Sequence, residues 1–146
     1  MAFTHLHLHT QYSLLEGAIQ TDVLFEKVKA LGMDSVAITD SHNLFGAIDF
    51  YLGAKKAKVK PIIGCEIFYA PNGRSAIAQA GGGPANQNIP RLYHLVLLCK
   101  DLKGYQNLCQ MVTRSYLDAP PPQKGQPAGP RALVDRDLLD KWGDGL

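Results

Sequence analysis

Three histidines near the amino terminus alternate with leucines in the run His5-Leu6-His7-Leu8-His9. Residues two apart in a β-strand point to the same face, at a spacing of roughly 6.5 Å. A strand over residues 3–9 would therefore place the three imidazoles side by side, where they can bind one metal ion or two neighbouring ones. Imidazole suits zinc, iron and manganese. The alternative is an exposed strand face that happens to be rich in histidine.

Two further candidates follow the apolar run at residues 35–39, namely Asp40 and His42. Ligands and catalytic groups in parallel α/β folds gather just beyond the carboxyl ends of strands. His42 is therefore a candidate metal ligand, and Asp40 is a candidate catalytic group that could orient a ligand or a water molecule. The alternatives are a helix cap or Asx-turn for Asp40 and an ordinary exposed loop position for His42.

Glu66 and His94 lie inside apolar runs that are typical of strands. A carboxylate in such a strand is costly unless it is paired or bound to metal, so Glu66 is a candidate ligand or one half of a buried ion pair. His94 is either a ligand or an ordinary core histidine, and Glu16 taken alone is typical of a surface acid. Histidines and carboxylates without a thiolate pattern favour hydrolytic metal chemistry, in which two or three ions could clamp a phosphate and activate water.

The elements that must position these residues alternate along the chain. The predicted strands cover residues 3–9, 35–39, 61–69 and 92–100. The predicted helices cover residues 21–31, 44–58, 104–116 and 132–142. Alternating strands and helices with short connections predict a parallel sheet or barrel of the α/β class. A closed eightfold α/β barrel needs about 250 residues, so this chain would form roughly the first half of a barrel.

Composition sets the remaining limits. The chain has 146 residues, of which 46% are hydrophobic and 19% charged, and its formal charge of +2 excludes a strongly basic arm for nucleic acid. Residues 78–90 and 119–130, rich in glycine, alanine, proline and amides, are predicted to be flexible loops. Three cysteines without C-x-x-C spacing favour reduced thiols in the cytoplasm. No apolar run approaches the roughly 20 residues of a membrane span, and neither a signal peptide nor a membrane partner is expected.

Three segments carry a resemblance to a known family: THLHLHTQYSLLEGAI, AITDSHNLFGAIDFYLGAKKAKVKPIIGCEIFYAP and YHLVLLCKDLKGYQNL. They resemble the amino-terminal PHP (polymerase and histidinol phosphatase) domain of bacterial DNA polymerase III alpha subunits. The similarity covers most of residues 1–117, and its motifs are those of the replicative polymerase branch. Residues 1–146 are therefore expected to be the amino-terminal part of a PHP domain, and the chain a fragment, because later ligands of the family would lie beyond Leu146.

The resemblance implies a seven-stranded β/α barrel with up to three divalent metal ions in its mouth, either zinc, manganese or iron. The family's ligand positions match His7, His9, Glu16, Glu66 and His94. One departure concerns the family pattern T-D-H-G-N, which is Thr39-Asp40-Ser41-His42-Asn43 in this chain. Ser41 stands at the usual histidine position, and His42 is a displaced candidate ligand.

The resemblance also implies a function in DNA replication. The expected partners are DNA, the remainder of a polymerase alpha subunit and other replisome subunits. The palm aspartates of a DNA-directed DNA polymerase would lie outside this chain, so the expected role is structural or that of a metal-dependent 3′–5′ exonuclease. A free-standing phosphoesterase and a non-catalytic, metal-free module are the alternatives.

Overall fold

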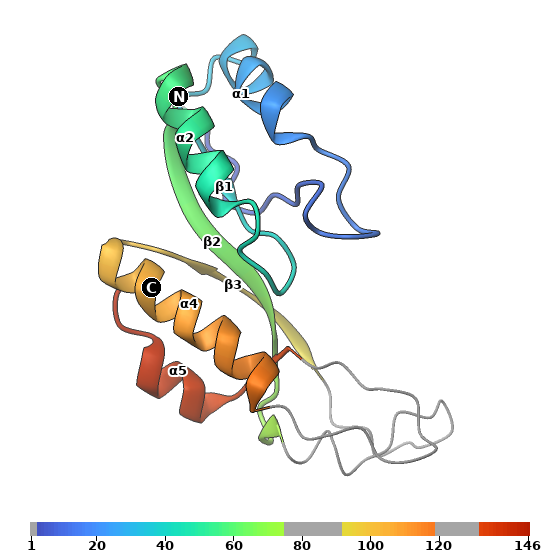
Figure 1. Ribbon diagram of the computed structural model, residues 1–146, viewed down its shortest axis with the longest axis vertical. Coiled ribbons are helices and arrows are strands. Elements are labelled where there is room, and N and C mark those ends of the chain that lie inside the picture. The colour runs from blue at the N-terminus through green and yellow to red at the C-terminus, as the bar shows by residue number, and fades with distance from the viewer. Residues whose placement is uncertain (1–2, 75–91, 119–131) are drawn as a thin grey trace.

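The structure, a computed structural model, describes residues 3–74, 92–118 and 132–146, and the loops predicted at 78–90 and 119–130 lie outside these ranges. The described part is an α/β arrangement built on a four-stranded sheet (Figure 1). In chain order the elements are α1 (Thr21–Ala30), β1 (Ser35–Ile38), α2 (Ala47–Ala57), β2 (Lys60–Tyr69), β3 (Tyr93–Leu98), α4 (Leu102–Leu117), β4 (Leu133–Val134) and α5 (Arg136–Trp142).

Strand β2 organises the sheet, because it pairs with the three other strands. Its first residues pair in parallel with β1, and its later residues pair antiparallel with β3. The last two residues of β2 also pair in parallel with β4. Since those two residues already pair with β3 on one edge, β4 follows β1 along the opposite edge. The candidate ligand Glu66 lies in the stretch of β2 between β1 and β4.

The antiparallel pairing of β2 with β3 contradicts the predicted all-parallel sheet. Parallel neighbours need a crossover connection, usually a helix with an apolar stripe. The sequence between β2 and β3 contains the run AQAGGGPANQN, which has no such stripe. The sheet is therefore mixed, although the individual strands at 35–39, 61–69 and 92–100 are confirmed as β1, β2 and β3 with shifted ends.

The amino-terminal segment lies beside β1 but is not a regular strand, so the strand predicted over 3–9 is wrong. The Ala37 N–H donates to the His5 carbonyl and the Thr39 N–H donates to the Leu8 carbonyl, each at 2.9 Å. These donors are two residues apart on one side and their acceptors three apart on the other. An extra residue of this kind interrupts a ladder, as in a β-bulge. The Leu8 N–H is satisfied instead by the Thr39 hydroxyl at 2.7 Å.

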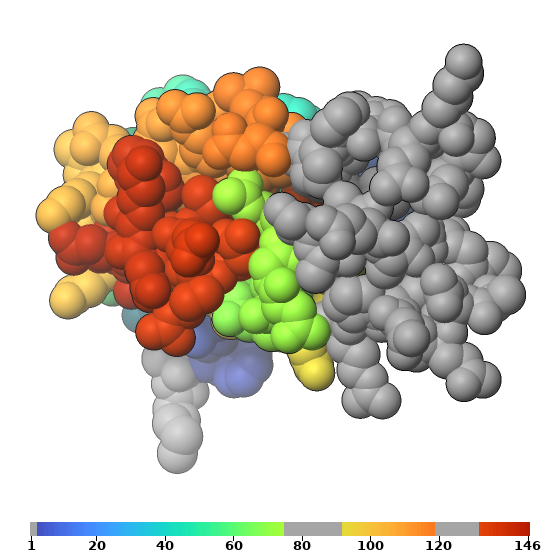
Figure 2. Space-filling view, turned by 90° about the horizontal axis from the view of Figure 1, so that it is seen from below, coloured from blue at the N-terminus to red at the C-terminus, as the bar shows by residue number. Residues whose placement is uncertain are grey.

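Buried hydrophobic residues form two clusters, one toward each end of β2. The first joins α1, β1 and α2 through residues that include Phe25, Val28, Val36 and Phe50. The second joins β2, α4, β4 and α5 through Cys65, Ile67, Leu108, Met111, Val134 and Leu138. Figure 1 shows α2 beside the upper part of β2, with α1 next to α2, and α4 beside the lower part, with α5 next to α4. Figure 2 shows α5 near the end of β2. Both clusters anchor the strand that carries Glu66.

Helix ends follow local hydrogen bonding. The Asp101 carboxylate accepts from the Gly104 N–H at 2.8 Å and begins α4, and the Asp135 carboxylate accepts from the Leu138 N–H at 3.2 Å and begins α5. The helix predicted over 132–142 is therefore wrong in its first turn, which forms the buried strand β4. The helices predicted at 21–31, 44–58 and 104–116 are confirmed as α1, α2 and α4 with shifted ends.

Within the described ranges, no helix has the length and apolar character needed to cross a membrane.

Candidate metal centre

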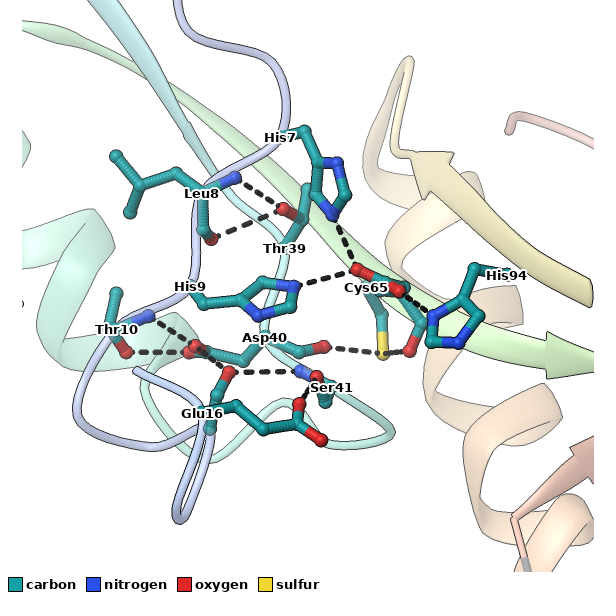
Figure 3. A network of polar contacts seen from close by, with 12 residues as sticks. His7, Leu8, His9, Thr10, Glu16, Thr39, Asp40, Ser41, Cys65 and His94 are labelled. Carbon is teal, nitrogen blue, oxygen red and sulfur yellow. Dashed lines mark hydrogen bonds and ion pairs between the residues drawn. The ribbon is translucent and has the colours of Figure 1, made fainter. Parts of the chain in front are cut away.

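Three imidazoles converge on the buried carboxylate of Glu66, whose side chain is 5% exposed. Its Oε2 atom contacts Nε2 of His7 and Nε2 of His9, the latter at 2.7 Å. Its Oε1 atom contacts Nδ1 of His94 (Figure 3). The histidines come from the amino-terminal segment and from β3, so the fold brings together four of the six predicted metal ligands.

Strand register explains how His94 reaches the carboxylate. Glu66 lies directly opposite Val96 in the antiparallel pair, whereas His94 lies opposite Phe68. His94 and Glu66 are therefore diagonal neighbours on one face of the sheet, a separation that long side chains can bridge.

The amino-terminal histidines do not all share one face. His7 and His9 lie together, with their ring centroids 5.1 Å apart. The ring of His5 instead packs edge-on against Phe3 at 4.8 Å and takes no part in the cluster. The bulge between His5 and Leu8 breaks the alternation that a regular strand would impose, so the predicted row of three imidazoles is reduced to two.

The donor atoms fit a divalent metal ion. His7, His9 and Glu66 each offer one ligand atom, and these atoms lie within 4.8 Å of one another. Bonds from zinc to imidazole nitrogen or carboxylate oxygen are about 2.0–2.2 Å, so one ion could contact such donors with small side-chain adjustments. A set of two nitrogens and one oxygen suits zinc, iron or manganese.

Electrostatics keep Glu66 ionised. Burial raises the pKa of its carboxyl group, but hydrogen bonds with His94, His7 and His9 outweigh burial and lower the pKa from 4.5 to about 2. The carboxylate is therefore negatively charged at neutral pH. A buried negative charge beside imidazole nitrogens is favourable for a cation.

Asp40 occupies a different network one strand away. The side chain is almost fully buried, with the residue 1% exposed. Oδ1 accepts from the Thr10 N–H and the Ser13 hydroxyl, both at 2.6 Å, and Oδ2 accepts from the Thr10 hydroxyl at 2.7 Å. Asp40 thereby ties the turn that follows His9 to the end of β1. Its predicted orienting role stays a prediction, and in this structure the groups it orients belong to the chain itself.

Sequence reasoning missed Thr10 and Ser13. Both are almost fully buried, and both donate to Asp40. Hydroxyl residues in a loop are common and have no distinctive spacing. The one available signal was their position directly after the histidine run, in Thr10-Gln11-Tyr12-Ser13.

Glu16 lies outside the Glu66 cluster and faces Ser41. The Ser41 hydroxyl donates to Oε2 of Glu16. The Ser41 N–H donates to the Ser13 hydroxyl oxygen at 3.1 Å, which fixes the serine near the turn that carries Glu16. The residue that stands at the family's histidine position is therefore bonded to a predicted ligand.

His42 also lies apart from the cluster. Its φ of 59° is in the left-handed region, which glycine adopts most easily, and glycine is the family residue at this position. Its ring stacks on Phe68 with centroids 4.2 Å apart. Burial lowers the pKa of His42, against the opposing effect of Glu16 and Glu66. Its Nδ1 atom is buried and has no hydrogen-bond partner among the residues that the structure describes.

Cys65, the neighbour of Glu66, is an inert part of the site. Its thiol donates to the Asp40 carbonyl at 3.2 Å, and burial raises its pKa to about 12. A thiol with that pKa stays protonated at neutral pH and is a poor metal ligand. The site therefore depends on nitrogen and oxygen donors.

Comparisons with known proteins find a family and several relatives that this chain resembles. The sequence profile of the PHP domain family matches residues 5–146. The DNA polymerase III alpha subunit of Borreliella burgdorferi is 42% identical over 144 residues, which are 99% of this chain and 11% of that protein. The alpha subunit of Helicobacter pylori strain 26695 is 44% identical over 117 residues, 80% of this chain and 9% of that protein. The alpha subunit of Aquifex aeolicus is 40% identical over 146 residues, 99% of this chain and 12% of that protein. The chain thus spans about a tenth of the length of these relatives.

Two solved structures share the fold. An amidohydrolase from Chromobacterium violaceum, with bound sulfate and no metal, has a TM-score of 0.55 and 17% identity, covering 79% of this chain and 34% of that one. A proposed metal-dependent phosphoesterase from Bifidobacterium adolescentis has a TM-score of 0.53 and 17% identity, covering 80% of this chain and 34% of that one. At this identity the likeness concerns the fold alone. Together with the family profile, it confirms the predicted α/β fold as part of a PHP barrel.

Proposed function

Since the chain belongs to the PHP domain family, we propose that residues 1–146 are the amino-terminal part of the PHP domain of a bacterial DNA polymerase III alpha subunit and hold a divalent metal for phosphoester hydrolysis. The observation that carries this proposal is the convergence of His7, His9 and His94 on both oxygens of the buried Glu66 carboxylate. The identities of 40–44% to polymerase alpha subunits support the place in replication.

Four side chains would hold the metal. His7 and His9 offer Nε2, Glu66 offers its carboxylate, and His94 lies at the opposite oxygen of that carboxylate. When bound, a divalent ion polarises a phosphoryl group and makes water a stronger nucleophile near neutral pH. Zinc, manganese and iron all fit these donors.

The charge and the exposure of the site also bear on its proposed function. Glu66 supplies the fixed negative charge, and Asp40 holds the turn after His9 in place. The side chains of His7 and His94 are 56% and 62% exposed, so the outer side of the cluster is open to solvent. An open site suits the end of a large substrate such as a DNA strand better than full enclosure of a small molecule.

Glu16 and His42 are the weaker members of the proposed ligand set. Glu16 would have to exchange its hydrogen bond with Ser41 for a metal, and His42 would have to leave Phe68. We therefore propose that the Glu66 cluster binds the first ion, and that Glu16 and His42 contribute only when further ions bind.

The proposed reaction is 3′–5′ exonucleolytic cleavage of DNA, with the rest of the alpha subunit and other replisome proteins as partners. The relatives are named as polymerase subunits, which supports DNA as the substrate. A structural, non-catalytic role is the second candidate, and the Ser41–Glu16 hydrogen bond favours it because it engages a ligand position without a metal.

Elemental mass spectrometry of the purified chain tests the proposal. We expect stoichiometric zinc, manganese or iron in the wild-type chain and its loss in a His7→Ala/His9→Ala double variant. His5→Ala is the matched control, because His5 belongs to the same run but packs on Phe3, and it should keep the metal. A wild-type chain without metal, also after incubation with each ion, would contradict metal binding.

Hydrolysis assays then separate the two candidate roles from each other and from that of a free-standing phosphoesterase. The metal-loaded chain should release nucleotides from the 3′ end of single-stranded DNA in preference to cleaving a small phosphomonoester such as p-nitrophenyl phosphate. Preference for the monoester would favour a free-standing phosphoesterase. Metal binding without hydrolysis of either substrate would establish the structural role.

A further inference from the structure

The ring of Phe68, next to the Glu66 cluster, contacts the rings of two histidines. Phe68 follows Glu66 by two residues on β2, so both side chains lie on one face of the sheet. The ring of His94 meets Phe68 edge-on, with centroids 4.8 Å apart and an interplanar angle of 79°. The ring of His42 lies against Phe68 on a flatter angle of 33°, with centroids 4.2 Å apart. We call these three residues, His42, Phe68 and His94, the ring row.

His94 needs a neighbour to hold its ring. Its side chain is 62% exposed, so few surrounding atoms restrict its rotation. Phe68 is its direct cross-strand partner, whereas Glu66 is its diagonal neighbour. The ring of Phe68 therefore fills the space straight across the strands, and His94 leans along the sheet toward Glu66. Figure 3 shows His94 turned toward the cluster from the β3 side.

His42 packs against Phe68, and two hydrogen bonds fix its backbone. The His42 N–H donates to the Glu66 carbonyl at 2.8 Å. The Tyr116 hydroxyl donates to the His42 carbonyl at 3.0 Å. These hydrogen bonds hold the His42 backbone between β2 and α4. The imidazole of His42 packs from this position against the ring of Phe68. This packing gives the displaced histidine of the sequence a role that requires no bond to a metal.

We propose that Phe68, backed by His42, is a positioning residue that holds Nδ1 of His94 toward Glu66. The proposal deepens the metal site and rests on the proposed function, because its benefit is a preformed set of donors. A ligand that is already oriented loses less rotational freedom when the metal binds, so affinity rises without a new bond.

A titration with Co²⁺, followed by its visible absorption, tests the effect on affinity. Phe68→Leu removes the ring and keeps an apolar side chain, and we expect its Kd for Co²⁺ to rise about tenfold, as is typical for groups that orient a ligand. Phe68→Tyr keeps the ring and should bind as the wild type does. Tyr69→Leu is the matched control, because Tyr69 is adjacent on β2 and faces the other side of the sheet.

A double-mutant cycle separates positioning from a general loss of structure. If Phe68 acts through His94, Phe68→Leu should have no further effect on the Kd in a His94→Ala background. Equal losses in the two backgrounds would overturn the proposal, because they would show that Phe68 affects the site independently of His94.

A second readout requires no metal. In the NMR spectrum of the metal-free chain, the ring protons of His94 should be shifted by the neighbouring ring of Phe68, and Phe68→Leu should return them to their usual positions. An unchanged His94 spectrum in Phe68→Leu would overturn the positioning role. A wild-type chain that binds no Co²⁺ would contradict the proposed function instead, and the NMR result would still decide the placement of His94.

Discussion

Two carboxylates, Asp40 and Glu66, lie side by side in the fold and do different things. The backbones of the two residues are in contact, since the Glu66 N–H donates to the Asp40 carbonyl at 3.1 Å. The Asp40 carboxylate accepts from two hydroxyl groups and a backbone amide of the described residues, whereas the Glu66 carboxylate faces imidazoles. A backbone amide can only donate, but an imidazole nitrogen either donates or offers a lone pair to a metal. The Asp40 network therefore fixes the structure, and the Glu66 network is open to exchange with a ligand.

Burial separates the two networks further. The donors to Asp40, Thr10 and Ser13, are buried with it, so they have no water to replace a lost bond. Two of the three histidines at Glu66 are more than half exposed, and solvent can take over their hydrogen bonds. We therefore expect a change of the carboxylate to affect folding most at Asp40 and ligand binding most at Glu66.

Amidation of Asp40 should have the largest effect on stability. Asp40→Asn keeps the shape but replaces one acceptor oxygen by a donor that faces Thr10 or Ser13. Hydrogen bonds to charged groups contribute about 1.5–3 kcal/mol, so we expect the free energy of unfolding to fall by about 3 kcal/mol. Urea denaturation followed by circular dichroism measures it.

The matched control for that variant is Asp49→Asn. Asp49 is exposed, and its carboxylate accepts one hydrogen bond, from the Tyr12 hydroxyl at 3.1 Å. Its amidation should change stability by about 0.5 kcal/mol or less. Equal losses of stability in the two variants would show that the Asp40 network stabilises the fold no more than an ordinary exposed carboxylate does.

Amidation of Glu66 should mainly affect metal binding. Glu66→Gln removes the negative charge on which three imidazoles converge, and we expect Zn²⁺ affinity to fall by about 100-fold or more. Because a ligand that binds the folded state raises the melting temperature, the same concentration of Zn²⁺ should stabilise the wild-type chain much more than the variant. Thermal unfolding with and without Zn²⁺ measures both.

Glu16→Gln is the comparison for the metal measurement, since Glu16 is held by Ser41 outside the cluster. Its loss of affinity should be much smaller than that of Glu66→Gln. If Glu16→Gln lost more metal affinity than Glu66→Gln, the metal site would be centred on Glu16 and not on the Glu66 cluster.

The smallest expected effect is the pH dependence that Glu66 gives the metal-free chain. Hydrogen bonds with histidine lower the pKa of Glu66 from 4.5 to about 2, so the ionised carboxylate stabilises the fold fully above pH 4.5. That contribution is lost as the pH falls from 4.5 toward 2. Solvent screening at the exposed histidines limits its size. Denaturation measured between pH 4.5 and 2 should show that the free energy of unfolding falls more steeply with pH for the wild type than for Glu66→Gln. Parallel pH dependences of the two proteins would contradict the stabilising role of ionised Glu66.

The sequence predicts the Glu66 cluster better than it predicts the Asp40 network. His7 and His9 stand out by their spacing, and Glu66 stands out because a charged residue interrupts an apolar strand. Such residues violate the expected pattern, and the violation itself is the signal. Their convergence in the structure fits the prediction, while their role as ligands stays a prediction.

The parts that sequence reasoning missed depend on contacts between distant segments. Thr10 and Ser13 are ordinary loop residues until β1 places Asp40 beside them. Phe68 has the pattern of any strand residue, and its proposed role follows from its pairing with His94 on β3. The bulge that turns His5 away also arises only when the amino-terminal segment lies along β1. The local pattern of the sequence does not predict these pairings between distant segments.

The partners of Glu66 are separated from it by 59, 57 and 28 residues along the chain. Contacts between such distant segments form only after the chain entropy of closing the loops between them has been lost. The proposed metal donors would therefore come together only when β2 has paired with β3 and the amino-terminal segment has docked. A metal ion at this site would not act as an early local nucleus in the way that closely spaced ligands allow in a zinc finger.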